Sequence, residues 1–138
     1  MELKRRNAIL MGAGAFLVAN LPVRASASVE DVIAEFTGGA EVGTGDIIIT
    51  APEIAENGNT VPIEVSSGTA VEILVLATGN PTPNVATFKF GKLAASRAAS
   101  TRIRLAGTQD VVAIAKLDDG SFVKASSTVK VTIGGCGG

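Results

Sequence analysis

The chain of 138 residues contains no histidine, no tyrosine and no tryptophan, and its single cysteine is Cys136. A structural zinc site needs about four ligands, typically cysteine or histidine, and this set cannot supply them. A nucleophilic Cys–His pair cannot form within the chain either. We therefore expect no catalytic residue, no metal and no bound cofactor.

The first 27 residues have the pattern of an export signal. A basic start that includes Arg5 and Arg6 precedes a mildly apolar stretch over residues 8–19, and the tripeptide Ala25-Ser26-Ala27 follows it. This order is typical of a signal peptide, and the paired arginines favour the twin-arginine route. The apolar stretch is shorter than the roughly 20 residues of a membrane span; a degraded anchor helix is the alternative. We expect a periplasmic protein that begins at Ser28.

Basic residues are scarce after this segment. The chain has 12 Lys and Arg and 13 Asp and Glu, of which residues 1–27 carry four and one, so residues 28–138 keep 8 and 12, a formal charge of -4. Because nucleic acids are bound mainly through Lys and Arg, this balance argues against a nucleic-acid partner. Bases are absent from Glu30 to Glu72 and predominate from Lys89 to Lys130. This distribution indicates two solvated faces of opposite sign, or a surface that steers partners.

Residues 28–133 are predicted to form one domain with one hydrophobic core. Ser28 followed by acidic residues is typical of a helix start, and Gly38-Gly39 ends the helical spacing. After Gly45 the apolar period changes to two, which predicts strands over residues 47–49, 61–65, 70–77, 85–90, 101–105, 110–117, 122–125 and 129–133. Short strands at this regular spacing, with turns between them, predict an immunoglobulin-like antiparallel β-sandwich with a short N-terminal helix.

Two of these strands have further requirements. Pro62 cannot donate a hydrogen bond, so it must lie at an edge or with its nitrogen facing outward. Residues 70–77 are apolar on both faces apart from Glu72, so both faces must be covered. We expect a partner protein to cover part of this strand around Leu74 and Leu76; burial within the chain's own core is the alternative.

The end of the chain places its one thiol among four glycines: Gly134, Gly135, Cys136, Gly137 and Gly138. Glycine has no Cβ, so these five residues are expected to form a thin, flexible arm with a reach of about 17 Å at roughly 3.4 Å per residue. No side chain on the arm can act as a base or stabilise an oxyanion. We therefore interpret Cys136 as a covalent attachment site, and a frayed tail is the alternative.

Several segments resemble the SoxY family of sulfur-oxidation carriers. They are residues 51–62, 84–88 and 100–106, and the strand VKVTI at 129–133 that runs directly into GGCGG. The likeness covers essentially all of residues 28–138, and the cysteine centred in terminal glycines is its most specific part. The resemblance implies a periplasmic carrier of the thiosulfate-oxidising Sox pathway that forms a heterodimer with SoxZ. It also implies that Cys136 holds the pathway intermediates covalently.

The resemblance implies three partner enzymes as well. The haem-containing SoxAX would couple thiosulfate oxidatively to the thiol of Cys136, giving a cysteine S-thiosulfonate. The hydrolase SoxB would then release the terminal sulfone as sulfate, and the sulfane dehydrogenase SoxCD would oxidise the remaining sulfur. No other residue is assigned a chemical role by the resemblance.

Two alternatives belong to other classes. A sulfur carrier activated at a C-terminal Gly-Gly would hold its load on the terminal carboxylate, but that chemistry needs cytoplasmic ATP and conflicts with the export signal. A structural or adhesive sandwich domain would use Cys136 only to cross-link chains, so it would form a stable disulfide dimer and accept no sulfur load.

Overall fold

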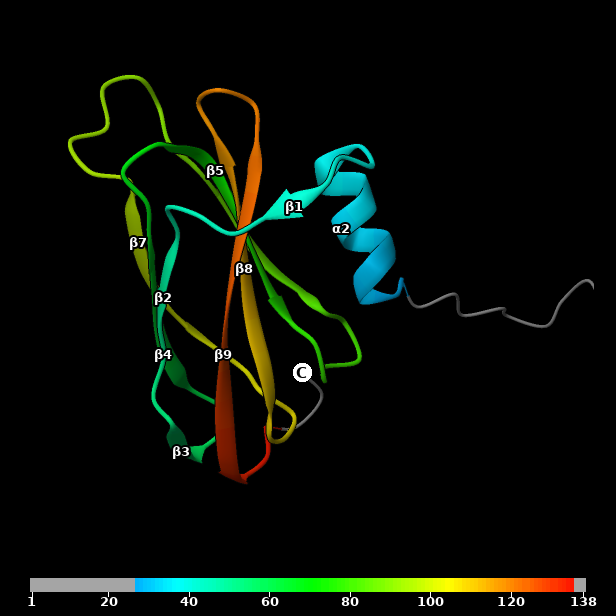
Figure 1. Cartoon of the computed structure of the whole chain (residues 1–138). Helices are drawn as coiled ribbons and strands as arrows, with labels where there is room; N and C mark the ends of the chain where they lie inside the picture. Colours follow the sequence, from blue (N-terminus) through cyan, green and yellow to red (C-terminus); the bar gives the residue numbers. More distant parts are fainter. Residues whose placement is uncertain (1–26, 136–138) are drawn as a thin grey trace, which may run out of the picture.

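Two β-sheets face each other, and the helix α2 lies against the outer face of the larger sheet (Figure 1). The structure is a computed structural model that describes residues 27–135. In this part of the chain the elements are α2 (Val29–Thr37), β1 (Val42–Gly43), β2 (Ile48–Thr50), β3 (Ile54–Asn57), β4 (Val61–Ser66), β5 (Ala70–Ala77), β6 (Asn84–Lys89), β7 (Ala98–Ile103), β8 (Gln109–Leu117) and β9 (Phe122–Ile133). The predicted two-sheet sandwich with one short N-terminal helix is thereby confirmed.

The larger sheet has the order β1-β9-β8-β5-β6, with β3 paired to β9 as its sixth strand, and the smaller sheet has the order β2-β4-β7. Most pairings are antiparallel, as predicted, but β1 and β3 both run parallel to β9. The twelve-residue strand β9 pairs with β8 up to Val129, and β3 pairs with it from Lys130 onward. The end of β9 is therefore held by β3.

The core between the sheets follows the predicted alternation along the strands. Its fully buried side chains come from both sheets and are aliphatic: Val61, Val65, Ile73, Val75, Leu105, Val111, Ala113, Ala115 and Val129 are among them. Burying one valine, leucine or isoleucine side chain contributes about 1.5–3 kcal/mol.

The second face of β5 is covered by the chain's own helix. Val32 and its neighbours on α2 pack on Leu74, Leu76 and Ile114 in a second apolar cluster. The ring of Phe36 meets Phe122 edge to face, with centroids 5.7 Å apart. Leu74 is 2% exposed and Leu76 is fully buried, so the prediction that a partner covers this part of β5 is wrong.

Local signals set the two ends of α2. The hydroxyl oxygen of Ser28 accepts a hydrogen bond from the Asp31 amide at 3.2 Å, and the Asp31 carboxylate accepts one from the Ser28 amide at 3.3 Å. Gly38 ends the helix in the left-handed region, with φ of 64°, where a side chain would be strained. The helix predicted from Ser28 to Gly38 is confirmed in type and bounds.

Candidate functional site

The strand β9 ends at Ile133 and leads directly into the glycine segment. Gly134 and Gly135 belong to the described residues. Cys136, Gly137 and Gly138, like Arg5 and Arg6 of the predicted export signal, lie outside them. The structure therefore shows where the glycine segment leaves the last strand, and the roles of these five residues stay predictions.

Three backbone hydrogen bonds of 2.8 Å link the end of the chain to the turn at Gly58 and to the loop at Leu105. The Gly58 amide donates to the Ile133 carbonyl, the Leu105 amide donates to the Gly58 carbonyl, and the Gly135 amide donates to the Leu105 carbonyl. Gly58 follows β3 and precedes β4, and Leu105 follows β7. We call Gly58, Leu105 and Ala106 the arm seat, because they surround Gly134 and Gly135.

Gly134 and Gly135 are packed closely against the arm seat. Gly135 is buried, and a Cβ built on it would lie 2.9 Å from the Gly58 carbonyl oxygen and 3.1 Å from that of Leu105. A Cβ on Gly134 would overlap the carbonyl oxygen of Ala106. At these two positions the structure differs from the free arm expected over residues 134–138, because the backbone of Gly135 is hydrogen-bonded to the domain.

A side-chain network supports the loop that carries Leu105 and Ala106. The Asn80 amide group donates to the Arg104 carbonyl at 2.8 Å, and its oxygen accepts from the Ala106 amide at 2.9 Å. Gln109, which is 8% exposed, donates to the same Asn80 oxygen at 2.9 Å. These contacts with Asn80 hold the backbone on both sides of Leu105 in place.

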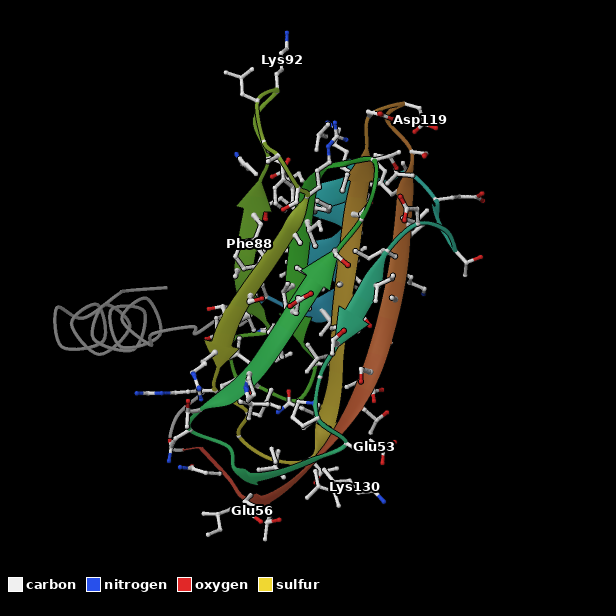
Figure 2. All side chains as sticks on the ribbon, turned by 90° about the vertical axis from the view of Figure 1, so that its left-hand side faces the viewer. Glu53, Glu56, Phe88, Lys92, Asp119 and Lys130 are labelled. Carbon is white, nitrogen blue, oxygen red and sulfur yellow. The ribbon has the colours of Figure 1, made fainter. Side chains whose placement is uncertain are left out.

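Charges of both signs surround this end of the sandwich. Figure 2 shows Glu53, Glu56 and Lys130 together at one end, and Lys92 and Asp119 at the opposite end. The backbone amide of Lys130 donates to the Glu53 carbonyl at 2.9 Å, which ties the start of β3 to β9. Side chains of both signs therefore lie at the end of the sandwich where β3 meets β9.

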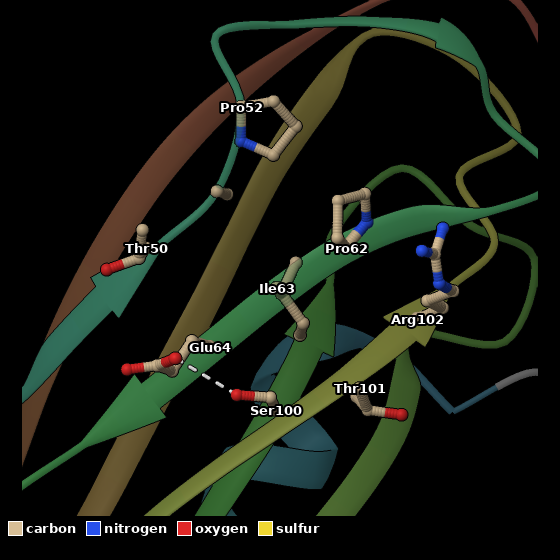
Figure 3. A pocket seen from close by; sticks show the side chains of 9 residues that line it. Thr50, Pro52, Pro62, Ile63, Glu64, Ser100, Thr101 and Arg102 are labelled. Carbon is tan, nitrogen blue, oxygen red and sulfur yellow. Dashed lines mark hydrogen bonds between the residues drawn. The ribbon is translucent and has the colours of Figure 1, made fainter.

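The smaller sheet has an open groove of about 620 Å³ (Figure 3). It lies where β2 ends at Thr50 while β4 continues back to Pro62, which pairs with Arg102 of β7 but has no partner in β2. The prediction that Pro62 avoids a two-sided ladder is confirmed. Within the groove, Glu64 accepts a hydrogen bond from Ser100 at 3.0 Å. None of the lining residues was predicted as a site residue.

The described residues contain few features of an active site. No group of three or more His, Cys, Asp or Glu side chains among residues 27–135 is arranged to hold a metal ion. The pKa of Asp119 is lowered by the Ser121 hydroxyl, which donates at 2.6 Å, and by the Ser121 amide, but Asp119 lies at the opposite end of the molecule from Glu56 (Figure 2). Along the same residues, no helix is long and apolar enough to cross a membrane.

The residues that sequence reasoning missed are Gly58, Leu105, Asn80 and Gln109. The Asn57-Gly58 pair predicts a tight turn, and nothing local indicates that its glycine touches the end of the chain. The presence of glycine at position 58, between β3 and β4, is the signal that could have indicated this contact, because two backbones can approach closely where a residue has no side chain.

A family model and a solved structure both relate this chain to the SoxY family. The family described as "Sulfur oxidation protein SoxY" matches residues 33–136, a range that ends on Cys136. The structure of the sulfur carrier protein SoxY from Chlorobium limicola f thiosulfatophilum is 33% identical, with a TM-score of 0.64. That match covers 77% of this chain and 97% of the Chlorobium chain.

More distant structures share the fold. A superoxide reductase (neelaredoxin) from Ignicoccus hospitalis is 19% identical over 77% of this chain and 94% of its own, with a TM-score of 0.55. A putative superoxide reductase from Thermotoga maritima is 18% identical over 65% and 93%, with a TM-score of 0.51. At this identity the likeness concerns the sandwich alone. A search among curated proteins gives no match.

Proposed function

The chain belongs to the SoxY family of sulfur oxidation proteins, and we propose that it carries intermediates of thiosulfate oxidation covalently on Cys136 in the periplasm. The observation that carries this proposal is the position of Cys136. It is the chain's one cysteine, it is the last residue of the family match, and it comes directly after a glycine that is hydrogen-bonded to the domain. Cys136 is therefore joined directly to a residue that the folded domain holds.

The proposed chemistry needs one sulfur atom from this chain and reactive groups from other proteins. In loading, the thiol of Cys136 and thiosulfate form a sulfur–sulfur bond, one proton is released, and two electrons pass to the haem enzyme SoxAX. In the next step, SoxB adds water to the terminal sulfone, which leaves as sulfate and leaves a persulfide on Cys136. SoxCD would then oxidise that sulfane sulfur. The chain acts as a carrier throughout.

A free thiol has a typical pKa of about 8.5, so only a few per cent is thiolate at pH 7. The five residues of the glycine segment contain no basic side chain that would favour the thiolate. We propose that the sulfur is weakly reactive in solvent and becomes reactive inside an electropositive partner site.

We propose that the chain forms a heterodimer with SoxZ through a surface other than the α2 side of β5. Leu74 and Leu76 are covered by α2 and cannot be reached by a partner. Among the described residues, the larger sheet ends at β6 on one side and at β1 and β3 on the other, and the smaller sheet ends at β2 and β7, so each of these strands pairs on only one side. Unpaired edges of this kind favour pairing with another chain unless they are protected.

The test is loading of the purified protein by the haem enzyme and thiosulfate, followed by intact mass spectrometry. The wild-type chain should gain one S₂O₃ group, and Cys136→Ser should gain none, because serine cannot form the sulfur–sulfur bond. The melting temperature of the variant should match the wild type, because the substitution leaves every buried side chain of residues 27–135 unchanged. A load on Cys136→Ser would contradict the proposal.

A further inference from the structure

We propose that the arm seat, Gly58, Leu105 and Ala106, holds Gly134 and Gly135 in the folded protein, so that the pivot of the carrier lies after Gly135 and not at Ile133. The functional importance of this pivot rests on the proposed function, because the pivot matters only if the thiol is presented to other proteins. The seat itself is argued from contacts among described residues.

The first argument is that the hydrogen bonds of the seat form a connected chain. Gly58 bonds to Ile133 through its amide and to Leu105 through its carbonyl, and Leu105 bonds to Gly135 through its carbonyl. Each bond is 2.8 Å long, within the usual range for amide–carbonyl bonds. Gly135 is therefore held by a segment that is itself bonded to the end of β9.

The second argument is that glycine is needed on both sides of the contact. A Cβ on Gly58 would overlap the Leu105 carbonyl oxygen and would lie 2.8 Å from the Gly135 nitrogen and 2.9 Å from Val131 Cγ1. The backbone of Gly58 does not have a positive φ, so the requirement is close approach and not an unusual conformation. A Cβ on Gly134 would overlap the Ala106 carbonyl oxygen. The two backbones meet because neither carries a side chain.

The third argument is that side-chain hydrogen bonds hold the loop that carries Leu105 in place. Asn80 bonds to the backbone of Arg104 and Ala106, and Gln109 bonds to Asn80 and to the Gly107 carbonyl at 3.0 Å. Leu105 between them is fully buried in the core. The loop that receives Gly135 is therefore rigid on both sides of its acceptor carbonyl.

The seat sets how far Cys136 can travel. Consecutive Cα atoms are about 3.8 Å apart, so with Gly135 held the Cys136 Cα stays within that distance of a fixed point. Release of Gly134 and Gly135 would add two residues, or about 7 Å, to the reach. The seat thus gives partner enzymes a fixed place of exit for the thiol, and it limits the volume that the thiol samples.

The direct test uses amide hydrogen exchange and a spin label, with the protein as the full mature chain. The Gly135 amide should exchange slowly in the wild type. In Gly58→Ala it should exchange about fivefold faster or more, because the backbone hydrogen bond that protects it is lost. A nitroxide attached to Cys136, the one cysteine, should become more mobile in the same variant.

Gly107→Ala is the matched control, because Gly107 lies in the same loop and a Cβ there would meet nothing within 4 Å. It should leave both readouts unchanged. Should Gly58→Ala fail to fold, Gly134→Ala disturbs the contact from the tail side, at Ala106, and should also release the Gly135 amide.

Rapid exchange of the Gly135 amide in the wild type, at the rate of an unstructured peptide, would overturn the seat. So would identical label mobility in the wild type, Gly58→Ala and Gly134→Ala. Failure of the proposed function would look different: Gly135 would be protected, but Cys136 would accept no sulfur load.

Discussion

Glycine serves two different purposes within the five residues from Gly134 to Gly138. Gly134 and Gly135 fit against carbonyl oxygens of the arm seat, where a side chain has no room. Gly137 and Gly138 follow Cys136, and their role stays the sequence prediction of a thin, flexible arm. Substitutions on the two sides of Cys136 should therefore have different effects.

Gly137→Val should leave the thiol chemically available while it adds bulk beside it. A small alkylating reagent should modify Cys136 at nearly the normal rate, whereas loading by the haem enzyme should fall on the order of 100-fold, because the added bulk keeps the thiol from being positioned in the enzyme's site. Rates of alkylation and loading measured side by side test this. Normal loading of the variant would mean that the glycine is only part of a frayed end.

Gly135→Val adds a structural effect to the same experiment. Its Cβ would be squeezed between the carbonyl oxygens of Gly58 and Leu105, so the end of the sandwich should be less stable than in Gly137→Val. This corrects the simpler expectation that every glycine of the segment acts through arm flexibility alone. Equal melting temperatures for the two variants would contradict the packing of Gly135.

At the scale of elements, the helix α2 is the cover for β5. Leu76→Ala should lower the free energy of unfolding by about 2–5 kcal/mol, because Leu76 is fully buried between β5 and α2. Ile48→Ala is the control, since Ile48 is 60% exposed on β2 and should change stability by about 0.5 kcal/mol or less. Urea unfolding curves measure both. A change in the free energy of unfolding for Leu76→Ala as small as that for Ile48→Ala would contradict the burial of Leu76.

Elements with strong local signals were predictable from the sequence. Ser28 and Gly38 bracket α2 because capping and the left-handed turn depend on residues within one turn of the helix. The strand over residues 70–77 was predicted with its observed bounds, because its apolar run lies between a glycine turn and a glycine-proline loop. The alternation of Val61, Ile63 and Val65 likewise predicted which face of β4 is buried.

Elements that depend on distant contacts were not predictable. The strands β1 and β3 are two and four residues long and have no periodic pattern of their own; they exist because β9 offers an unpaired edge. Residues 122–125 and 129–133 were predicted as two strands, but β9 is continuous through Ser126 and Ser127 because both pair with β8. The arm seat was missed for the same reason, since Gly58 and Gly135 meet only in the folded chain.

At the scale of the whole molecule, the proposed location makes a prediction about processing. The mature chain should begin at Ser28, and its helix cap should survive cleavage, because Ser28 supplies both groups of the capping pair with Asp31. Terminal sequencing of periplasmic protein checks this. Replacing Arg5 and Arg6 with lysine should block export by the twin-arginine route. Soluble, functional protein that retains Met1 would contradict the export signal.

The central claim is that Cys136 carries the sulfur load, and the most direct test is to measure which residue bears that load. Both methionines, Met1 and Met11, precede Ser28, so Cys136 holds the one sulfur atom of residues 28–138. Tandem mass spectrometry of the native protein, from cells supplied with thiosulfate, should place sulfur or S₂O₃ adducts on Cys136. A load on the Gly138 carboxylate would contradict the account in favour of Gly-Gly activation. An unloaded protein isolated only as a Cys136 disulfide dimer would contradict it in favour of a cross-linking domain.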